Sequence, residues 1–156
     1  MANIGIIGAG SWGIALSILL YNNGNKVTVW SVIEDEIKML NEKREHERCL
    51  PGVKLPDDMV FTTDLEHTIK NADLLVLAVP SVYTRSTSKS MSGYVREGQI
   101  IVNVAKGIEE NTLKTLTQII EEEIPCADVA ALSGPSHAEE VSRSIPTTCV
   151  VAAHSR

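Results

Sequence analysis

The sequence predicts an α/β fold in which a doubly wound, mostly parallel sheet has helices on both faces. Strand-like and helix-like hydrophobic patterns alternate along its 156 residues. The runs Asp73–Val79 and Gln99–Val104 are almost continuously apolar, which is typical of parallel strands buried on both faces. An N-terminal apolar strand leads into Gly8–Gly13 (GAGSWG) and then into a helical pattern, the context of the glycine-rich turn in Rossmann-type folds.

The first half of the chain is predicted to begin with this strand and helix, and Gly24 is a suitable residue for ending the helix. Turn-forming residues between Leu50 and Asp58 indicate a loop. The expected elements are a strand at Asn3–Ile7, a helix at Trp12–Tyr21, a strand at Lys26–Trp30, a helix with Ile33, Ile37 and Leu40 at helical spacing, a short strand at Met59–Thr62, and a helix from the N-cap Asp64 to about Asn71.

The second half continues the alternation of strands and helices. Pro80 ends its first strand and Pro125 ends its second helix, since proline interrupts the hydrogen bonding of both structures. Ser136 followed by Glu139 predicts a capping box. The expected elements are strands at Asp73–Val79, Gln99–Val104, Val129–Leu132 and Thr147–Ala152, and helices at Tyr83–Tyr94, around Leu113, Leu116 and Ile120, and at Ser136–Arg143.

Composition indicates one soluble globular domain, with 44% hydrophobic and 22% charged residues. The net charge of -6 and the lack of a lysine or arginine block argue against nucleic-acid or anionic-membrane binding. No apolar run approaches the roughly 20 residues needed to cross a bilayer, and no signal peptide is expected. The widely spaced Cys49, Cys126 and Cys149 fit no metal site and suggest reduced thiols in the cytoplasm.

Four polar segments follow the carboxyl ends of predicted strands: Gly8–Gly13, Val79–Ser81, Lys106–Gly107 and Ser133–Ser136. Ligands of doubly wound sheets bind beyond these strand ends, at the point where the strand order reverses. The four segments are therefore expected to line one edge of the sheet and to form a ligand site.

The glycine-rich turn predicts a dinucleotide ligand. Gly8 would permit the tight turn, Gly10 the close approach of a pyrophosphate, and Gly13 the packing of helix against strand. The pyrophosphate would lie on the N–H groups of the helix N-terminus. An acid for the ribose 2′-hydroxyl is expected at the end of the second strand, but Trp30–Val32 contains none, and Glu34 and Asp35 come later, so this spacing does not choose between NAD and NADP.

Three further polar residues follow the predicted strand ends and have side chains capable of chemistry: Lys106, Ser136 and His137. Lys106 could hold a phosphate or polarise a carbonyl, or it could be a solvated loop residue. The helix start at Ser136 could bind an anion, whereas His137 is expected to be a surface or packing residue. No Ser/His/Asp order or His/Cys cluster supports hydrolysis or a metal site. The other histidines are expected in solvent: His46, His67 and His154.

Taken together, the motifs resemble the N-terminal domain of bacterial NAD(P)-dependent glycerol-3-phosphate dehydrogenases. The first motif is common to many dehydrogenases, and the last two together are far more specific. The resemblance covers essentially the whole chain, with motifs at Gly8–Gly13, Leu50–Gly52 with Leu55-Pro56, Ala78–Ser81, Lys106–Glu109 and Leu132–Val141.

The resemblance implies reversible hydride transfer between glycerol 3-phosphate and dihydroxyacetone phosphate, with NAD or NADP as cofactor. It also implies that this reaction feeds glycerophospholipid synthesis. It also implies a homodimer for the full-length protein. The residues it assigns to the cofactor are Gly8, Gly10, Ser11, Trp12, Gly13, Lys106 and Ala138. The residues it assigns to the substrate are Lys106, Gly134 and Ser136.

The chain departs from the family at several positions. Val32 stands where the family often has an arginine for the NADP 2′-phosphate, which favours NAD, and Cys49 and His137 replace usual aromatics. The family continues into a helical C-terminal domain with the general acid/base lysine. Residues 1–156 are therefore expected to be the cofactor-binding domain without that catalytic residue. The alternatives are another two-domain dehydrogenase, of the 6-phosphogluconate or hydroxyacid type, and a non-catalytic nucleotide-sensing module.

Overall fold

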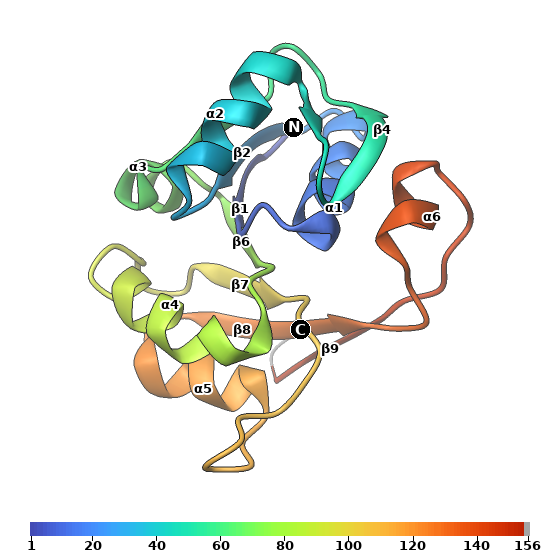
Figure 1. The fold of residues 1–156 in the computed structure, drawn as a ribbon. Coiled ribbons are helices and arrows are strands. Elements are labelled where there is room, and N and C mark those ends of the chain that lie inside the picture. The colour runs from blue at the N-terminus through green and yellow to red at the C-terminus, as the bar shows by residue number, and fades with distance from the viewer. Residues whose placement is uncertain (155–156) are drawn as a thin grey trace.

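The computed structural model describes residues 1–154, and within them helices cover both faces of a seven-stranded sheet (Figure 1). The strands are β1 (Asn3–Ile7), β2 (Lys26–Trp30), β3 (Glu45–His46), β4 (Leu50–Lys54), β5 (Val60–Thr62), β6 (Leu74–Leu77), β7 (Ile100–Asn103), β8 (Asp128–Ser133) and β9 (Val150–Ala153). The helices are α1 (Ser11–Asn22), α2 (Glu34–Lys43), α3 (Leu65–Lys70), α4 (Thr84–Met91), α5 (Leu116–Glu123) and α6 (Ala138–Ser142), with a 3-10 turn, η1 (Ser81–Tyr83), before α4.

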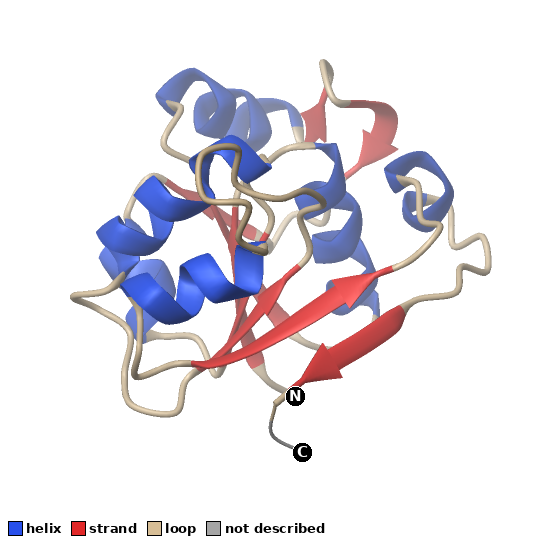
Figure 2. Cartoon of the chain, turned by 90° about the horizontal axis from the view of Figure 1, so that it is seen from below, coloured by secondary structure: helices blue, strands red, loops and turns tan. Residues whose placement is uncertain are grey.

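The strand order in the main sheet is β5-β2-β1-β6-β7-β8-β9. All neighbouring pairs are parallel except β8 and β9, whose antiparallel pairing is visible in Figure 2. β1 pairs with β2 on one side and with β6 on the other, so the order reverses between β1 and β6. This order confirms the predicted Rossmann-type, doubly wound fold, and it places the switch point at the carboxyl ends of β1 and β6.

Two apolar layers stabilise the sheet, because neighbouring residues of a strand point to opposite faces. Ile6 on β1 packs in the layer formed with α1, α2 and α6, whereas Ile7 packs in the layer formed with α3, α4 and α5. Both side chains are fully buried. The continuous apolar runs of the sequence therefore correspond to strands with a core on each side, as predicted.

The segment expected to be a loop at Leu50–Asp58 contains strand β4, which forms a two-stranded sheet with β3, so this prediction was wrong in part. Pro51 lies inside β4, where a two-stranded ribbon leaves one side of each strand without a partner. The same hairpin buries His46, which is 2% exposed and not in solvent as expected. His67 is exposed, as predicted.

Two predicted helix starts were also wrong. Leu113 was placed on a helix, but it precedes α5, has a positive φ of 56° and is 72% exposed. Thr115 starts α5 through a capping box with Gln118, which fixes the first helical residue at Leu116. No capping box forms at Ser136, because His137 is the N-cap of α6 and the Ser136 hydroxyl donates to the Gly134 carbonyl at 3.4 Å.

Candidate functional site

The glycine-rich turn connects β1 to α1 at the switch point, and its three glycines meet different surroundings. A Cβ on Gly13 would lie 2.1 Å from the Gly8 carbonyl oxygen, so helix and turn are in close contact there. Gly8 has a φ of +116°, and a Cβ on it would lie 2.9 Å from the Ala78 carbonyl group. A Cβ on Gly10 would meet nothing within 4 Å. Gly8 and Gly13 are thus required by the fold, whereas Gly10 borders open space.

Helix α1 presents an anion-binding N-terminus to this open space. Gly10 is its N-cap, and no side chain caps the helix or places a carboxylate in its first turn. The first N–H groups of a helix lack intrahelical acceptors and form the positive end of its dipole. Ser11 and Trp12, the first two helical residues, are half-buried at the mouth of this site. Because Gly10 has no side chain, nothing at this residue blocks an anion from approaching these N–H groups.

A cavity of about 420 Å³ lies on one side of the turn and brings together all four predicted segments. Lys106 is the one lysine or arginine among its described lining residues. Its Nζ lies 3.4 Å from the Ser136 carbonyl oxygen, which links the loop after β7 to the segment after β8. The other lining residues are Gly10, Ser11, Trp12, Ala78, Val79, Pro80, Ser81, Val104, Ala105, Ser136, His137, Ala138 and Glu139.

Gly134, a predicted substrate residue, has a different position. It is absent from the described lining of this cavity, and a Cβ on it would lie 2.5 Å from the Thr148 carbonyl oxygen. The chain therefore packs closely between β8 and β9 at this glycine. His137 is exposed at the cavity, in agreement with the surface position expected for it.

A second cavity, of about 700 Å³, lies on the other side of the turn, between the ends of β2 and β6. Its described lining includes Trp30–Ile33 and Tyr83, and no lysine or arginine. Both cavities include Gly10 and the segment Ala78–Pro80 in their walls, so they meet along the glycine-rich turn. The two adjoining cavities suit a long ligand with a central anionic group and one arm in each cavity.

The second cavity has an acidic residue that the sequence spacing did not identify. Glu36 lines it from the first turn of α2 and accepts a hydrogen bond from the Ser31 hydroxyl at 2.5 Å. The His46 Nε2 lies 3.0 Å from the other carboxylate oxygen, and the Cys49 N–H donates to His46 Nδ1. Because Nδ1 accepts this bond, the ring proton resides on Nε2 and is donated to Glu36. The carboxylate is therefore held at the end of β2.

The arginine at the end of α2, Arg44, has its guanidinium on other groups and does not line the second cavity. The Arg44 guanidinium donates to the Met59 carbonyl at 2.7 Å and lies 5.4 Å from the centre of the Phe61 ring. Val32 is 75% exposed at the end of β2. Glu36 is the one acidic residue in the described lining of the second cavity, and Glu34 and Asp35 share the first turn of α2 with it, so this end of the cavity is acidic.

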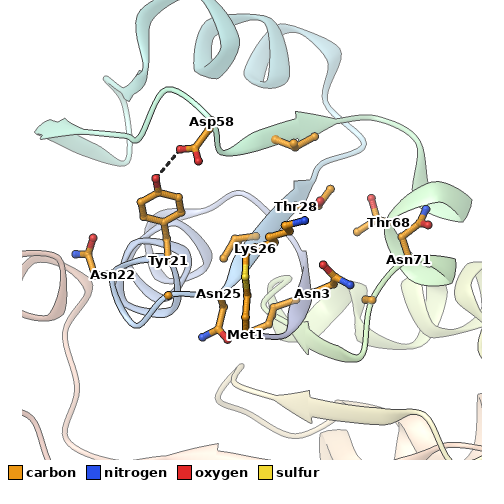
Figure 3. A pocket seen from close by; sticks show the side chains of 15 residues that line it. Met1, Asn3, Tyr21, Asn22, Asn25, Lys26, Thr28, Asp58, Thr68 and Asn71 are labelled. Carbon is orange, nitrogen blue, oxygen red and sulfur yellow. Dashed lines mark hydrogen bonds between the residues drawn. The ribbon is translucent and has the colours of Figure 1, made fainter.

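A third cavity, of about 580 Å³, lies at the opposite edge of the sheet, around the amino ends of β1 and β2 (Figure 3). Tyr21 donates a hydrogen bond to Asp58 there at 2.5 Å, and this bond raises the pKa of the tyrosine. The cavity is remote from the glycine-rich turn and from Lys106. It is therefore no part of the predicted dinucleotide site.

Neither a metal site nor a membrane-spanning helix is found within residues 1–154. No group of three or more His, Cys, Asp or Glu side chains is arranged to hold a metal ion. None of the described helices has the length and apolarity needed to cross a membrane.

Comparisons with known proteins agree with this geometry. Residues 3–156 match a family model described as the NAD-dependent glycerol-3-phosphate dehydrogenase N-terminus. The chain is 65% identical over 156 residues to a glycerol-3-phosphate dehydrogenase (NAD(P)+) of Agathobacter rectalis, covering 100% of this chain and 46% of the relative. It is 53% identical over 158 residues to the corresponding protein of Fusobacterium nucleatum, covering 100% of this chain and 47% of that one.

Solved structures show the same likeness. A crystal structure of glycerol-3-phosphate dehydrogenase from Coxiella burnetii superposes with a TM-score of 0.92 at 28% identity, covering 98% of this chain and 47% of that one. The yeast glycerol-3-phosphate dehydrogenase gives a TM-score of 0.87 at 26% identity, with the same coverage of both chains. The chain spans about half the length of the relatives it matches.

Proposed function

Because the chain belongs to the family of NAD-dependent glycerol-3-phosphate dehydrogenase N-termini, we propose that it is the dinucleotide-binding domain of such an enzyme. The full-length protein would interconvert glycerol 3-phosphate and dihydroxyacetone phosphate, for glycerophospholipid synthesis. The observation that best supports this function is the pair of cavities that meet at Gly10. A Cβ added to Gly10 would meet no other atom within 4 Å, so this position leaves room for a ligand. The nicotinamide cofactor, when bound, supplies the hydride chemistry, and the protein supplies position and charge.

Cofactor binding is assigned to the turn and to residues of the smaller cavity. The N–H groups at the start of α1 would hold the pyrophosphate, with Ser11 and Trp12 beside it. The adenosine half of the cofactor would lie beside the end of β2, in the larger cavity. The complete proposed set is Gly8, Gly10, Ser11, Trp12, Gly13, Lys106 and Ala138.

Substrate binding is assigned to the far side of the smaller cavity. The Lys106 ammonium would attract the phosphorylated substrate and hold its reacting carbon near the cofactor, which lowers the entropic part of the barrier. Ser136 and Gly134 would add contacts from the segment after β8. The general acid/base is proposed to be a lysine of a helical C-terminal domain, so residues 1–156 would contain no catalytic residue.

The family assignment also bears on the alternatives and on the cellular setting. It favours this function over a dehydrogenase of the 6-phosphogluconate or hydroxyacid type. A nucleotide-sensing module is the second candidate, because the cavities at the glycine-rich turn suit a dinucleotide without requiring any reaction. Cytoplasmic location and a homodimer of the full-length protein are part of the same proposal.

The acidic mouth of the larger cavity supports NAD over NADP as the preferred cofactor. The 2′-phosphate of NADP would approach the Glu36 carboxylate, on a helix turn that also carries Glu34 and Asp35, and would find no cation at Val32. A carboxylate held as firmly as that of Glu36 is suited to accept hydrogen bonds from the ribose hydroxyls of NAD.

Calorimetric titration of the chain with NADH and NADPH tests both parts of this proposal. We expect NADH to bind at least about tenfold more tightly, which corresponds to about 1.4 kcal/mol. Val32→Arg is the matched variant, and it should narrow the difference by offering a guanidinium to the 2′-phosphate. Tighter binding of NADPH would contradict the preference and would indicate that Arg44 or Arg48 turns into the site. No binding of either nucleotide would contradict the function.

A further inference from the structure

One arginine on α4 lies at the centre of a carboxylate cluster beside the proposed site. Arg85 donates from Nε and Nη2 to the two carboxylate oxygens of Glu109, at 2.6 and 2.7 Å. It also donates from Nη1 to Glu123 at 2.8 Å and from Nη2 to Glu122 at 3.0 Å. The guanidinium thus uses a two-pronged contact on the loop after β7 and single contacts on α5. Two-pronged contacts between arginine and carboxylate fix geometry as well as charge.

The partner on the loop, Glu109, is three residues from Lys106. The Glu109 N–H donates to the Lys114 carbonyl and the Leu113 N–H donates to the Glu109 carbonyl, both at 2.9 Å. Residues Ile108 and Thr115 form an isolated bridge that closes the loop. The loop is thus a folded unit, and Glu109 joins it to α4.

The loop is also fixed close to Lys106 on its other side. Gly107 has a φ of +137°, and a Cβ on it would lie 3.0 Å from the Ser81 side chain. Gly107, which lies between Lys106 and Glu109 in the chain, is therefore held against Ser81 of η1. Only two residues separate Lys106 from Glu109, so a shift of Glu109 would be passed along the backbone to Lys106.

Arg85 is also required for charge balance within the cluster. Glu109 comes from the loop and Glu122 and Glu123 come from α5. Within residues 1–154, the one other cation in contact with these carboxylates is Lys114, which pairs with Glu122. Without Arg85, three carboxylates would face one another with a single ammonium nearby. Their repulsion would push the loop away from α5.

We propose that Arg85 is a positioning residue for Lys106: it fixes the loop 105–115 against α4 and α5, so that the Lys106 ammonium stays in the ligand cavity. This role rests on the proposed function of Lys106 in ligand binding. The guanidinium itself is absent from the described cavity lining, so its effect reaches the ligand through the loop. The competing interpretation is a plain ion pair that joins α4 to α5 and has no influence on Lys106.

Hydrogen exchange of the ligand-free chain tests the attachment of the loop. Arg85→Met should speed exchange at the Glu109 and Leu113 amides, because their hydrogen bonds close the loop. Lys89→Met is the control, since Lys89 is an exposed cation of the same helix and pairs with no carboxylate within residues 1–154. Glu109→Gln is the second variant, which removes the charge and one accepting oxygen of the loop contact and leaves Arg85 its partners on α5. Unchanged exchange in both test variants would overturn the proposal.

A double-mutant cycle tests the action through Lys106. We expect Arg85→Met to weaken NADH binding about fivefold when Lys106 is present. It should have no further effect in a Lys106→Met background, because no ammonium remains to be positioned. An equal loss in both backgrounds, or no loss in either, would overturn the positioning role. If the unmodified chain bound no NADH, the proposed function would fail first, and the exchange experiment would still report on the loop by itself.

Discussion

At the scale of single residues, the glycine-rich turn separates structural from ligand-related requirements. Gly13 and Gly8 are surrounded by backbone atoms, whereas Gly10 borders empty space. The protein's own packing thus explains why Gly8 and Gly13 must be glycines, but it does not explain Gly10. The absence of a side chain at Gly10 is explained if another molecule occupies that space.

Alanine substitutions at Gly13 and Gly10 should therefore have different effects. Gly13→Ala should destabilise the chain by about 3 kcal/mol or more, since a backbone oxygen would have to move away from the new Cβ. Gly10→Ala should change the free energy of unfolding by less than about 1 kcal/mol, since its φ of -64° suits any residue. It should nevertheless weaken NADH binding at least about tenfold.

Urea unfolding and calorimetry on both variants measure these two effects. Equal losses of stability in the two variants would contradict the division between them. So would NADH binding by Gly10→Ala with the affinity of the unmodified chain.

Residue roles could be predicted from the sequence only where a motif fixes the local geometry. The glycines and Lys106 follow strand ends, so their meeting at one edge was predictable. Glu36 was not identified, because its approach to the end of β2 depends on bonds with Ser31 and His46. The burial of His46 depends in turn on a hairpin with only two residues in one strand, which is too short to show in a hydrophobic pattern.

At the scale of elements, α4, α5 and the loop between β7 and α5 form one ion-paired unit. Its central guanidinium has a side chain that is 33% exposed, and that of Glu109 is 20% exposed. Hydrogen bonds from Arg85 lower the pKa of Glu109 to about 2. Glu109 therefore remains charged, and paired with Arg85, far below the ordinary titration range of a carboxyl group.

The stability that this unit contributes should depend on pH in a defined window. Because the pKa of Glu109 is lower in the folded chain than its usual value of 4.5, its contribution is fully present above about pH 4.5 and is lost as the pH falls toward 2. Arg85→Met removes the cause of the shift. The difference in unfolding free energy between the unmodified chain and Arg85→Met should therefore shrink across this window. High salt should reduce it at neutral pH, because the groups are partly exposed.

Thermal unfolding at a series of pH values measures this difference. Lys89→Met provides the matched control, and the corresponding difference for that variant should not change within the window. A difference for Arg85→Met that stays constant down to about pH 2 would contradict the assignment of the shift to Arg85.

Element types followed from periodicity, whereas several boundaries did not. β6 and β7 were predictable because their side chains are apolar on both faces. Leu113 lies at helical spacing from Leu116 and Ile120, but the capping box at Thr115 starts α5 after it. The observed start of α6 also lies after the predicted one, because Ser136 makes its bond to Gly134 and leaves the cap to His137.

At the scale of the whole molecule, the chain is expected to bind without turnover. NADH should bind to it, yet dihydroxyacetone phosphate should not be reduced, because the proposed acid/base lysine belongs to the half of its relatives that this chain does not span. Loss of NADH absorbance with time measures the reaction, with the full-length Agathobacter rectalis relative as the positive control. A rate close to that control would contradict the assignment of catalysis to the second half.

The overall architecture was the most predictable level, since a strand–helix alternation with buried strands leads to few topologies. The reversal of strand order between β1 and β6 followed from the glycine-rich turn, whose position in doubly wound folds is fixed. The antiparallel direction of β9 was not predicted. It depends on a return of the chain past α6 that no local pattern encodes.

The reversal of strand order has a consequence for how such a domain can evolve. β1 and β6 are neighbours, but the chain leaves them toward opposite edges of the sheet, which opens a cleft between their following segments. The cleft is thus inherited with the connectivity of the chain and needs no particular side chain to exist. Val32, Glu36 and Lys106 lie around it and can be exchanged without moving it. Selection can therefore change the molecule that is recognised while the place of recognition stays constant.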